Sequence, residues 1–160
     1  MSDIKYKDYS LDPFTMSTYN ELTLSKLIVA MSKDAELLTA DNSIELANKI
    51  VLLADVQTVI IELVGRSENS YTTARLEAQS AQAGRCKVRR DEWELEHPGV
   101  TRYPATAYFD DLALLDTKEL WTAANETKTT MSRFKSFRDN YETKINAQKK
   151  LLASLEMIRY

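Results

Sequence analysis

Four cationic side chains lie close together in the middle of the sequence, within the six positions from residue 85 to residue 90. They are Arg85, Lys87, Arg89 and Arg90. Clustered Lys and Arg side chains attract polyanions, and nucleic acid is the most common of these in the cell. A run of charge is also often only the solvated face of a helix, so the cluster alone leaves both interpretations open.

The spacing of these cations does not gather them on one face of a helix. Arg85 and Arg89 lie about 40° apart, whereas Lys87 and Arg90 lie on the other side and about 60° from each other. Acidic residues follow directly, so that residues 75–96 hold five basic and five acidic side chains. One copy of the chain should therefore attract phosphates weakly, and a continuous basic track would need several copies in an oligomer.

Aromatic residues flank the basic cluster. Tyr71, Trp93 and Tyr103 could stack on unpaired bases, as aromatic side chains do in many proteins that bind single strands. Aromatic residues more often anchor helices in a core. The aromatic residues therefore leave the choice between binding and packing open.

The sequence contains little that could perform catalysis or bind a metal. The one cysteine, Cys86, and the one histidine, His97, exclude a disulfide framework and a zinc site with several cysteines. His97 lies before a proline and is expected to cap a helix end. Carboxylates such as Asp110 and Asp111 are adjacent, so on a helix they point about 100° apart and do not converge on a substrate. We predict no enzyme activity, no metal and no cofactor.

The composition favours long helices. The 160 residues include only three glycines and three prolines, and both residue types interrupt helices. We predict an all-α protein: a small helical hairpin or bundle with long helices and a C-terminal helix of the coiled-coil type. The sequence begins without a signal-peptide pattern, and its most apolar run, residues 50–64, is short and interrupted by charge. We expect a soluble, cytoplasmic protein with no membrane partner.

The chain divides into four regions. These are a loosely held arm (1–16), a helical region with the basic cluster (17–96), a reversal (97–104) and a C-terminal helical region (105–160). The prolines of the reversal end one helix and begin another. Helix starts are expected at Ser17 or Thr18 and at the capping cluster 41–43, with a break or bend near Gly65.

The last helix has the clearest repeat, because mostly apolar positions from Phe134 to Arg159 alternate by four and three residues, and Ile158 is among the residues that widen this stripe. We assign five of its residues to self-association: Phe134, Tyr141, Ile145, Leu152 and Leu155. The same stripe could pack in the core of its own subunit, but we favour a seam between copies.

Charge is unevenly distributed along the chain. Residues 128–160 hold eight basic and three acidic side chains, whereas the residues before them hold thirteen basic and twenty-one acidic ones. This asymmetry could steer an anionic ligand or dock one copy on another.

One stretch resembles a known family. The run Arg75-Leu76-Glu77-Ala78-Gln79, followed by Arg85-x-Lys87, resembles the UvsY family, the recombination mediator proteins of large tailed phages. That family has a similar Arg-apolar-Glu-Ala-Gln run and a basic-x-basic pair at the same distance. The likeness covers roughly residues 32–155, and its specific part is residues 75–88. This chain departs from the pattern in a longer N-terminal arm and in the acidic run after Arg90.

The resemblance implies an all-helical subunit that forms a closed ring through its C-terminal helices and binds single-stranded DNA along repeated basic sites. It implies two protein partners in the host cell cytoplasm, a RecA-like recombinase and the single-strand DNA-binding protein that the mediator helps to displace. By position in the motif, Arg85 and Lys87 would contact DNA. We add Arg89 and Arg90 on their charge alone.

Two other functions stay open. The chain could be a helical adaptor or structural oligomer that binds protein partners and no nucleic acid, in which case Arg85 and Lys87 should form salt bridges. It could also be a small regulator that binds double-stranded DNA. That function needs base-reading side chains on one helix face, which the dispersed cations do not provide.

Overall fold

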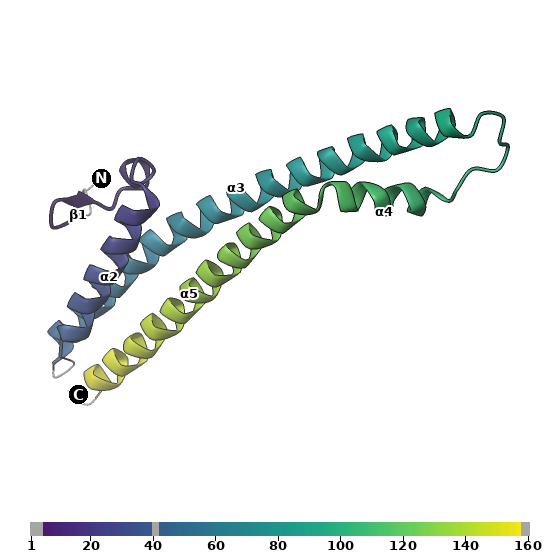
Figure 1. Ribbon diagram of the computed structural model, residues 1–160. Helices are drawn as coiled ribbons and strands as arrows, with labels where there is room; N and C mark the ends of the chain where they lie inside the picture. The colour runs from purple at the N-terminus through teal and green to yellow at the C-terminus, as the bar shows by residue number, and fades with distance from the viewer. Residues whose placement is uncertain (1–4, 40–41, 158–160) are drawn as a thin grey trace. The chain divides into compact units, whose positions relative to one another are not determined.

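The computed structural model describes residues 5–39 and 42–157, and it confirms a mostly helical chain, with 83% of these residues in helices (Figure 1). The described elements, in order, are β1 (Lys5–Tyr6), β2 (Tyr9–Ser10), α1 (Pro13–Met16), α2 (Glu21–Leu37), α3 (Ser43–Glu96), α4 (Thr106–Asp116) and α5 (Lys118–Met157). They form two compact units. Unit 1 contains the chain up to Arg66 and from Ser132 onward, and unit 2 is Ser67–Met131. No helix in the described ranges has both the length and the apolarity that crossing a membrane requires.

Unit 1 has an apolar core that three helices share. From α2 it takes residues one helical turn apart, such as Leu24, Ile28 and Met31, and from α3 residues such as Val56 and Ile60. The α5 helix adds Tyr141 and Ile145, each 4% exposed. This spacing buries one side of each helix, as the periodicity of an amphipathic helix requires.

The caps of these helices differ in part from the predicted ones. Asn20, not Ser17 or Thr18, caps α2, because its side-chain oxygen accepts a hydrogen bond from the Thr23 backbone N–H at 2.8 Å. Ser17 and Thr18 instead donate their hydroxyl groups to carbonyls of α1, at 2.6 and 2.7 Å. Within the predicted cluster 41–43, Asn42 accepts from the Glu45 backbone N–H at 2.9 Å and caps α3. Asp41 lies outside the described residues.

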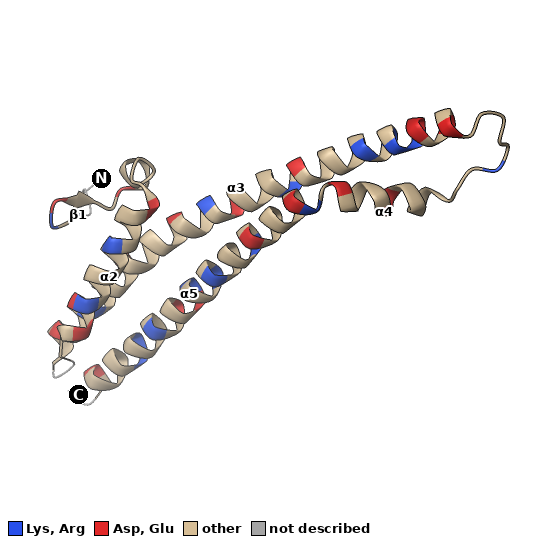
Figure 2. Ribbon diagram, in the orientation of Figure 1, with Lys and Arg blue, Asp and Glu red and all other residues tan. Residues whose placement is uncertain are grey.

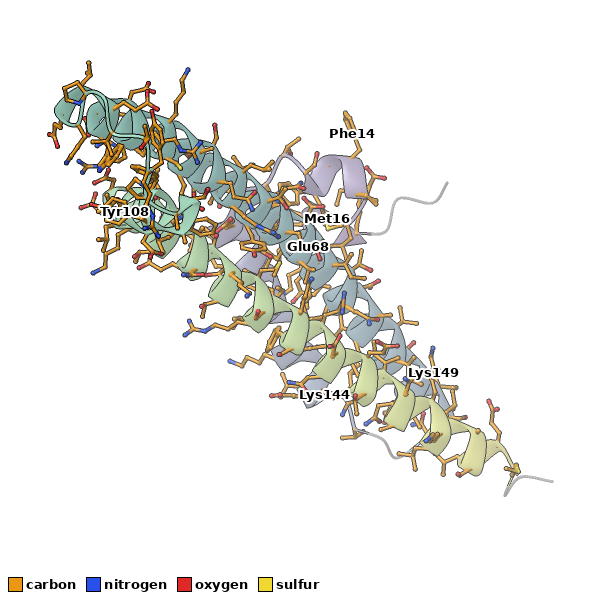
Figure 3. All side chains as sticks on the ribbon, turned by 90° about the vertical axis from the view of Figure 1, so that its right-hand side faces the viewer. Phe14, Met16, Glu68, Tyr108, Lys144 and Lys149 are labelled. Atoms are coloured by element: carbon orange, nitrogen blue, oxygen red, sulfur yellow. The ribbon has the colours of Figure 1, made fainter. Side chains whose placement is uncertain are left out.

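The N-terminal segment packs on unit 1 over residues 5–16, which differs from the loosely held arm predicted from the sequence. Leu11 and Met16 are 2% and 1% exposed, and the Tyr6 hydroxyl donates to the Asp34 carboxylate at 2.6 Å. Figure 3 shows Met16 directed inward and Phe14 directed into solvent. The strands β1 and β2 have only two residues each, which is too short for an alternating pattern to be visible in the sequence.

The two long helices continue without a break. α3 passes Gly65, where the sequence predicts a break or bend, and α5 passes residues 125–127. A glycine inside a helix costs only about 1 kcal/mol relative to alanine. The neighbours of Gly65, Leu63 and Val64, are buried in the core of unit 1, and their packing offsets that cost.

Unit 2 contains an antiparallel helical hairpin. The second half of α3 packs against α4 and the start of α5, with Phe109, Ala113, Thr117 and Ala124 buried between them. The reversal lies where the sequence predicts it, and Gly99 takes a φ of +83°, a left-handed conformation that favours glycine. α4 begins at Thr106, two residues after the proline that we expected in its first turn.

The five residues assigned to a self-association seam on α5 have different surroundings. Tyr141 and Ile145 are buried in their own chain, and Phe134 packs against the same core. Leu152 and Leu155 are only partly buried, and Ile158 and Arg159 lie outside the described residues. The role of this helix in self-association stays a prediction, and only Leu152 and Leu155 of the five are accessible for it without opening the core.

Replacing Ile145 with alanine should lower the free energy of unfolding by about 3 kcal/mol, because a buried side chain would leave a cavity. Urea denaturation at two protein concentrations measures this loss. Leu151→Ala, at a position that is 42% exposed, is the matched control and should change stability by less than about 0.5 kcal/mol. A loss that depends on protein concentration would instead place Ile145 in a contact between copies.

Candidate nucleic-acid interface

All four predicted cations lie on α3 within unit 2, and two of them meet one carboxylate. Arg89 donates from Nε to Asp116 Oδ2 at 2.9 Å and from Nη2 to Oδ1 at 2.8 Å. Arg85 reaches the same Oδ2 from Nε at 3.1 Å and from Nη2 at 3.0 Å. Asp116 is the last residue of α4, so these bonds join the two arms of the hairpin. Figure 2 shows the basic stretch of α3 followed by acidic residues at the end of the helix. The prediction that Arg85 and Arg89 share one face is confirmed.

The geometry makes this a strong ion pair by the standards of a protein surface. Both oxygens of Asp116 accept from the planar guanidinium of Arg89, which is the bidentate arrangement that arginine favours with carboxylates. The hydrogen bonds from Arg89, with Arg85 adding to them, lower the pKa of Asp116 to about 2. The same contact raises the pKa of Arg89. Its remaining Nη1 donates to Glu92 at 3.2 Å, so Arg89 is fully engaged within the chain.

Lys87 and Arg90 are placed differently. Lys87 is exposed, and no carboxylate in the described part of the chain forms an ion pair with it. Arg90 is also exposed, and its guanidinium carbon lies 5.7 Å from the centre of the Phe109 ring, a distance typical of a cation–π contact. The four cations therefore do not converge: two bind Asp116, one lies over a ring and one extends into solvent.

Aromatic rings gather beside this cluster, at the end of α3. The Trp93 ring stacks on the His97 ring with centres 4.5 Å apart and planes 13° apart, and it contacts Tyr103 at 5.3 Å. His97 Nδ1 donates to the Trp93 carbonyl at 3.0 Å, so this histidine closes the helix end. Tyr103 and Tyr108 remain 54% and 49% exposed. Tyr71 takes no part in this group of rings.

Acidic groups limit what the pocket beside these rings can bind. A cavity of about 140 Å³ is lined by Arg89, Glu92, Trp93, Glu96, Tyr108, Phe109 and Leu112. Two carboxylates in so small a space repel phosphate. This cavity is therefore a poor site for a phosphate group.

The remaining polar groups of unit 2 hold the hairpin together. The Cys86 thiol donates to Asp110 Oδ1 at 3.2 Å, and this hydrogen bond raises the pKa of the thiol. Trp121 Nε1 donates to Gln82 Oε1 at 2.9 Å. Within residues 5–39 and 42–157, no group of three His, Cys, Asp or Glu side chains could hold a metal ion.

The sequence did not identify Asp116, which forms ion pairs with two of the four cations. A weak signal for it exists in the sequence. Arg85 precedes the middle of the reversal, residues 97–104, by as many residues as Asp116 follows it on the opposite arm. Residues at equal distances from a tight reversal meet across an antiparallel hairpin, so a carboxylate at that position predicts an ion pair.

Comparisons with protein-family models, with curated proteins and with solved structures each found no match to this chain. The likeness to the mediator family therefore rests on the residues quoted above.

Asp116 should make unit 2 sensitive to acid. Its pKa in the folded chain is about 2, against an ordinary value of 3.8. The stabilisation from the ionised group is therefore fully present above about pH 4 and is lost as the pH falls toward 2. We expect Asp116→Asn to lower the melting temperature by a few degrees at neutral pH, and the difference from wild type to shrink toward pH 2.

Thermal denaturation followed by circular dichroism between pH 2 and 7 measures this effect. Asp111→Asn is the matched control, because Asp111 is an exposed carboxylate on the same helix. Equal melting temperatures for Asp116→Asn and wild type at neutral pH would show that the ion pairs add nothing to the hairpin.

Proposed function

We propose that this chain is a non-enzymatic recombination mediator that binds single-stranded DNA as an oligomer. In this role it helps a RecA-like recombinase load onto strands covered by a single-strand DNA-binding protein. One observation supports DNA binding above the others: exposed cations and exposed aromatic rings lie at the same end of the hairpin in unit 2. Proteins that bind single strands combine these two kinds of side chain, because cations follow the phosphates while bases stack on the rings.

The exposed cations and rings at this end of the hairpin are Lys87, Arg90, Tyr103 and Tyr108. Tyr108 is labelled in Figure 3. Lys87 is free to meet a phosphate. Tyr103 and Tyr108 are about half exposed, and an aromatic ring can stack on any of the bases. Binding by these groups should therefore depend strongly on salt and weakly on sequence.

Arg85 and Arg89 would take part only in competition with Asp116. A carboxylate and a phosphate offer arginine a similar pair of oxygens, so Asp116 occupies the position that a phosphate would need. Arg85 keeps a side-chain exposure of 43%, which leaves it the more accessible of the two. One copy should bind DNA weakly, and an oligomer that presents several copies to one strand would bind through avidity.

The partners in recombination are proposed from the resemblance. The run that carries it, residues 75–79, lies on the surface of α3 except for Ala78, which is fully buried. Leu76 is 59% exposed, an apolar side chain that is free to contact a protein. The recombinase and the single-strand DNA-binding protein are the partners that the mediator function requires.

A second function, a helical adaptor that binds proteins and no nucleic acid, is favoured by one specific observation. Arg85 and Arg89 are already paired with Asp116 in the isolated chain. In such an adaptor these arginines would only hold the hairpin together, and Lys87 would be a solvated side chain.

A salt titration of binding to a fluorescent single-stranded oligonucleotide separates the two functions. We expect affinity to fall steeply with salt. The double variant Arg85→Ala with Lys87→Ala should bind more weakly and reduce the salt slope by about 1 for each phosphate contact that is lost. Lys128→Ala, at an exposed lysine of the same unit, should behave like wild type.

Anisotropy at several salt concentrations gives both the affinity and the slope, and circular dichroism confirms that the variants fold. An affinity that changes neither with salt nor with the double substitution would contradict the assignment of Arg85 and Lys87 to a DNA site. A complete lack of oligonucleotide binding by the wild-type oligomer would favour the adaptor.

A further inference from the structure

The first half of α3, within unit 1, carries a second apolar stripe whose large side chains the described residues leave exposed. Its positions alternate by three and four residues: Ile44, Ala47, Val51, Ala54, Thr58, Ile61 and Gly65. None of these seven residues is charged. Ile44, Val51 and Ile61 are 74%, 60% and 53% exposed. The stripe therefore exposes large apolar side chains at the regular spacing of a coiled-coil seam.

The stripe lies opposite the core side of the helix. Core residues of α3 such as Val56, Ile60 and Leu63 centre about 180° away from it, at 100° per residue. The helices α2 and α5 contribute to the core on that other side. A partner helix could therefore approach the stripe without disturbing the packing of unit 1.

The hydroxyl group of Thr58, the polar side chain of the stripe, already has a hydrogen-bond partner. The Thr58 hydroxyl donates to the Ala54 carbonyl at 3.1 Å, so covering it leaves no unpaired donor. The small residues Ala47, Ala54 and Gly65 would allow a second helix to approach closely. A stripe without charge has no means of holding a phosphate backbone, so nucleic acid does not fit it.

We infer that this stripe is a self-association seam, in which the α3 helices of two copies pair in antiparallel orientation with Ala54 at the two-fold axis. In that arrangement large and small residues oppose one another along the seam. Ile44 faces Gly65 of the second copy, and Ile61 faces Ala47. Val51 faces Thr58, and Ala54 faces itself. A two-fold axis repeats each contact, so one uncharged stripe supplies both sides of a complementary interface.

A parallel pair would fit less well. Ala47 would oppose Ala47, which leaves a gap in the seam, and Ile61 would oppose Ile61, which crowds it. The antiparallel pair has one unfavourable feature, because Asp55 of each copy lies next to the axis and meets its own counterpart. Asp55→Asn should therefore strengthen association several-fold by removing the repulsion between like charges.

Disulfide trapping tests the orientation directly. In chains that carry Cys86→Ser, oxidation of a mixture of Ala47→Cys and Ile61→Cys should give cross-linked dimers. Each of these variants oxidised alone should stay uncross-linked. Cross-linking of each variant alone would establish parallel pairing and overturn the antiparallel seam, and no cross-linking in any mixture would overturn the seam itself.

Analytical ultracentrifugation of two lysine variants tests whether the stripe drives association. Val51→Lys should raise the dissociation constant at least tenfold, because it places a charge in the seam. Val29→Lys is the matched control: the same residue type, 69% exposed, on α2 of the same unit. Equal effects of the two variants would contradict the inference.

Both variants change exposed residues, so circular dichroism should show folded chains in each case. The inference does not depend on the proposed DNA binding. Self-association through this stripe without oligonucleotide binding would support the seam and contradict the mediator function. Oligonucleotide binding without self-association through this stripe would contradict the seam and leave the mediator function standing.

Discussion

The α3 helix contributes to both units, so the rest of the structure depends on which of its side chains face the neighbouring helices. In unit 2 that side carries Gln82, Arg85 and Arg89, where most helical hairpins would have apolar residues. A guanidinium turned toward another helix loses part of its hydration and needs a carboxylate partner. Asp116 supplies it for both arginines. The basic cluster therefore divides into a pair that holds the hairpin and two residues that stay exposed, Lys87 in solvent and Arg90 over the Phe109 ring.

This division explains how a chain with a conspicuous basic stretch can still attract nucleic acid weakly as a single copy. The cations that are free to meet phosphates are few, and acidic residues surround them. Repetition of the site in an oligomer would compensate for this. The seam inferred on α3 has two-fold symmetry and closes on itself, so a ring would need a second contact. Leu152 and Leu155, which are only partly buried, stay the predicted candidates for that contact.

Several features of the fold could be predicted from the sequence because they depend on local chemistry. The scarcity of glycine and proline predicts the long helices, and the prolines and glycine near residue 100 predict the reversal. Other features depend on packing between distant segments. The penalty at Gly65 is offset by buried neighbours, and the repeat on α5 looks the same in sequence whether it faces its own core or another copy. Tyr141 and Ile145 show that these two positions of the repeat face the core.

The candidate site was predictable only in part. The cation positions and the shared face of Arg85 and Arg89 follow from sequence and helix geometry. The partner of these arginines lies across the hairpin, 31 and 27 residues away, beyond the reach of local rules. The aromatic group at the end of α3 likewise forms from Trp93, Tyr103 and Phe109, which the reversal brings together.

If the proposed site binds DNA, Asp116 competes with phosphate for Arg85 and Arg89. The most direct test is the affinity of Asp116→Asn for a single-stranded oligonucleotide, measured beside wild type and Asp111→Asn at several salt concentrations. We predict that Asp116→Asn binds several-fold more tightly, with a salt dependence steeper by about 1 to 2 in slope as the freed arginines reach phosphates. A folded Asp116→Asn variant whose affinity and slope equal those of wild type would contradict the claim.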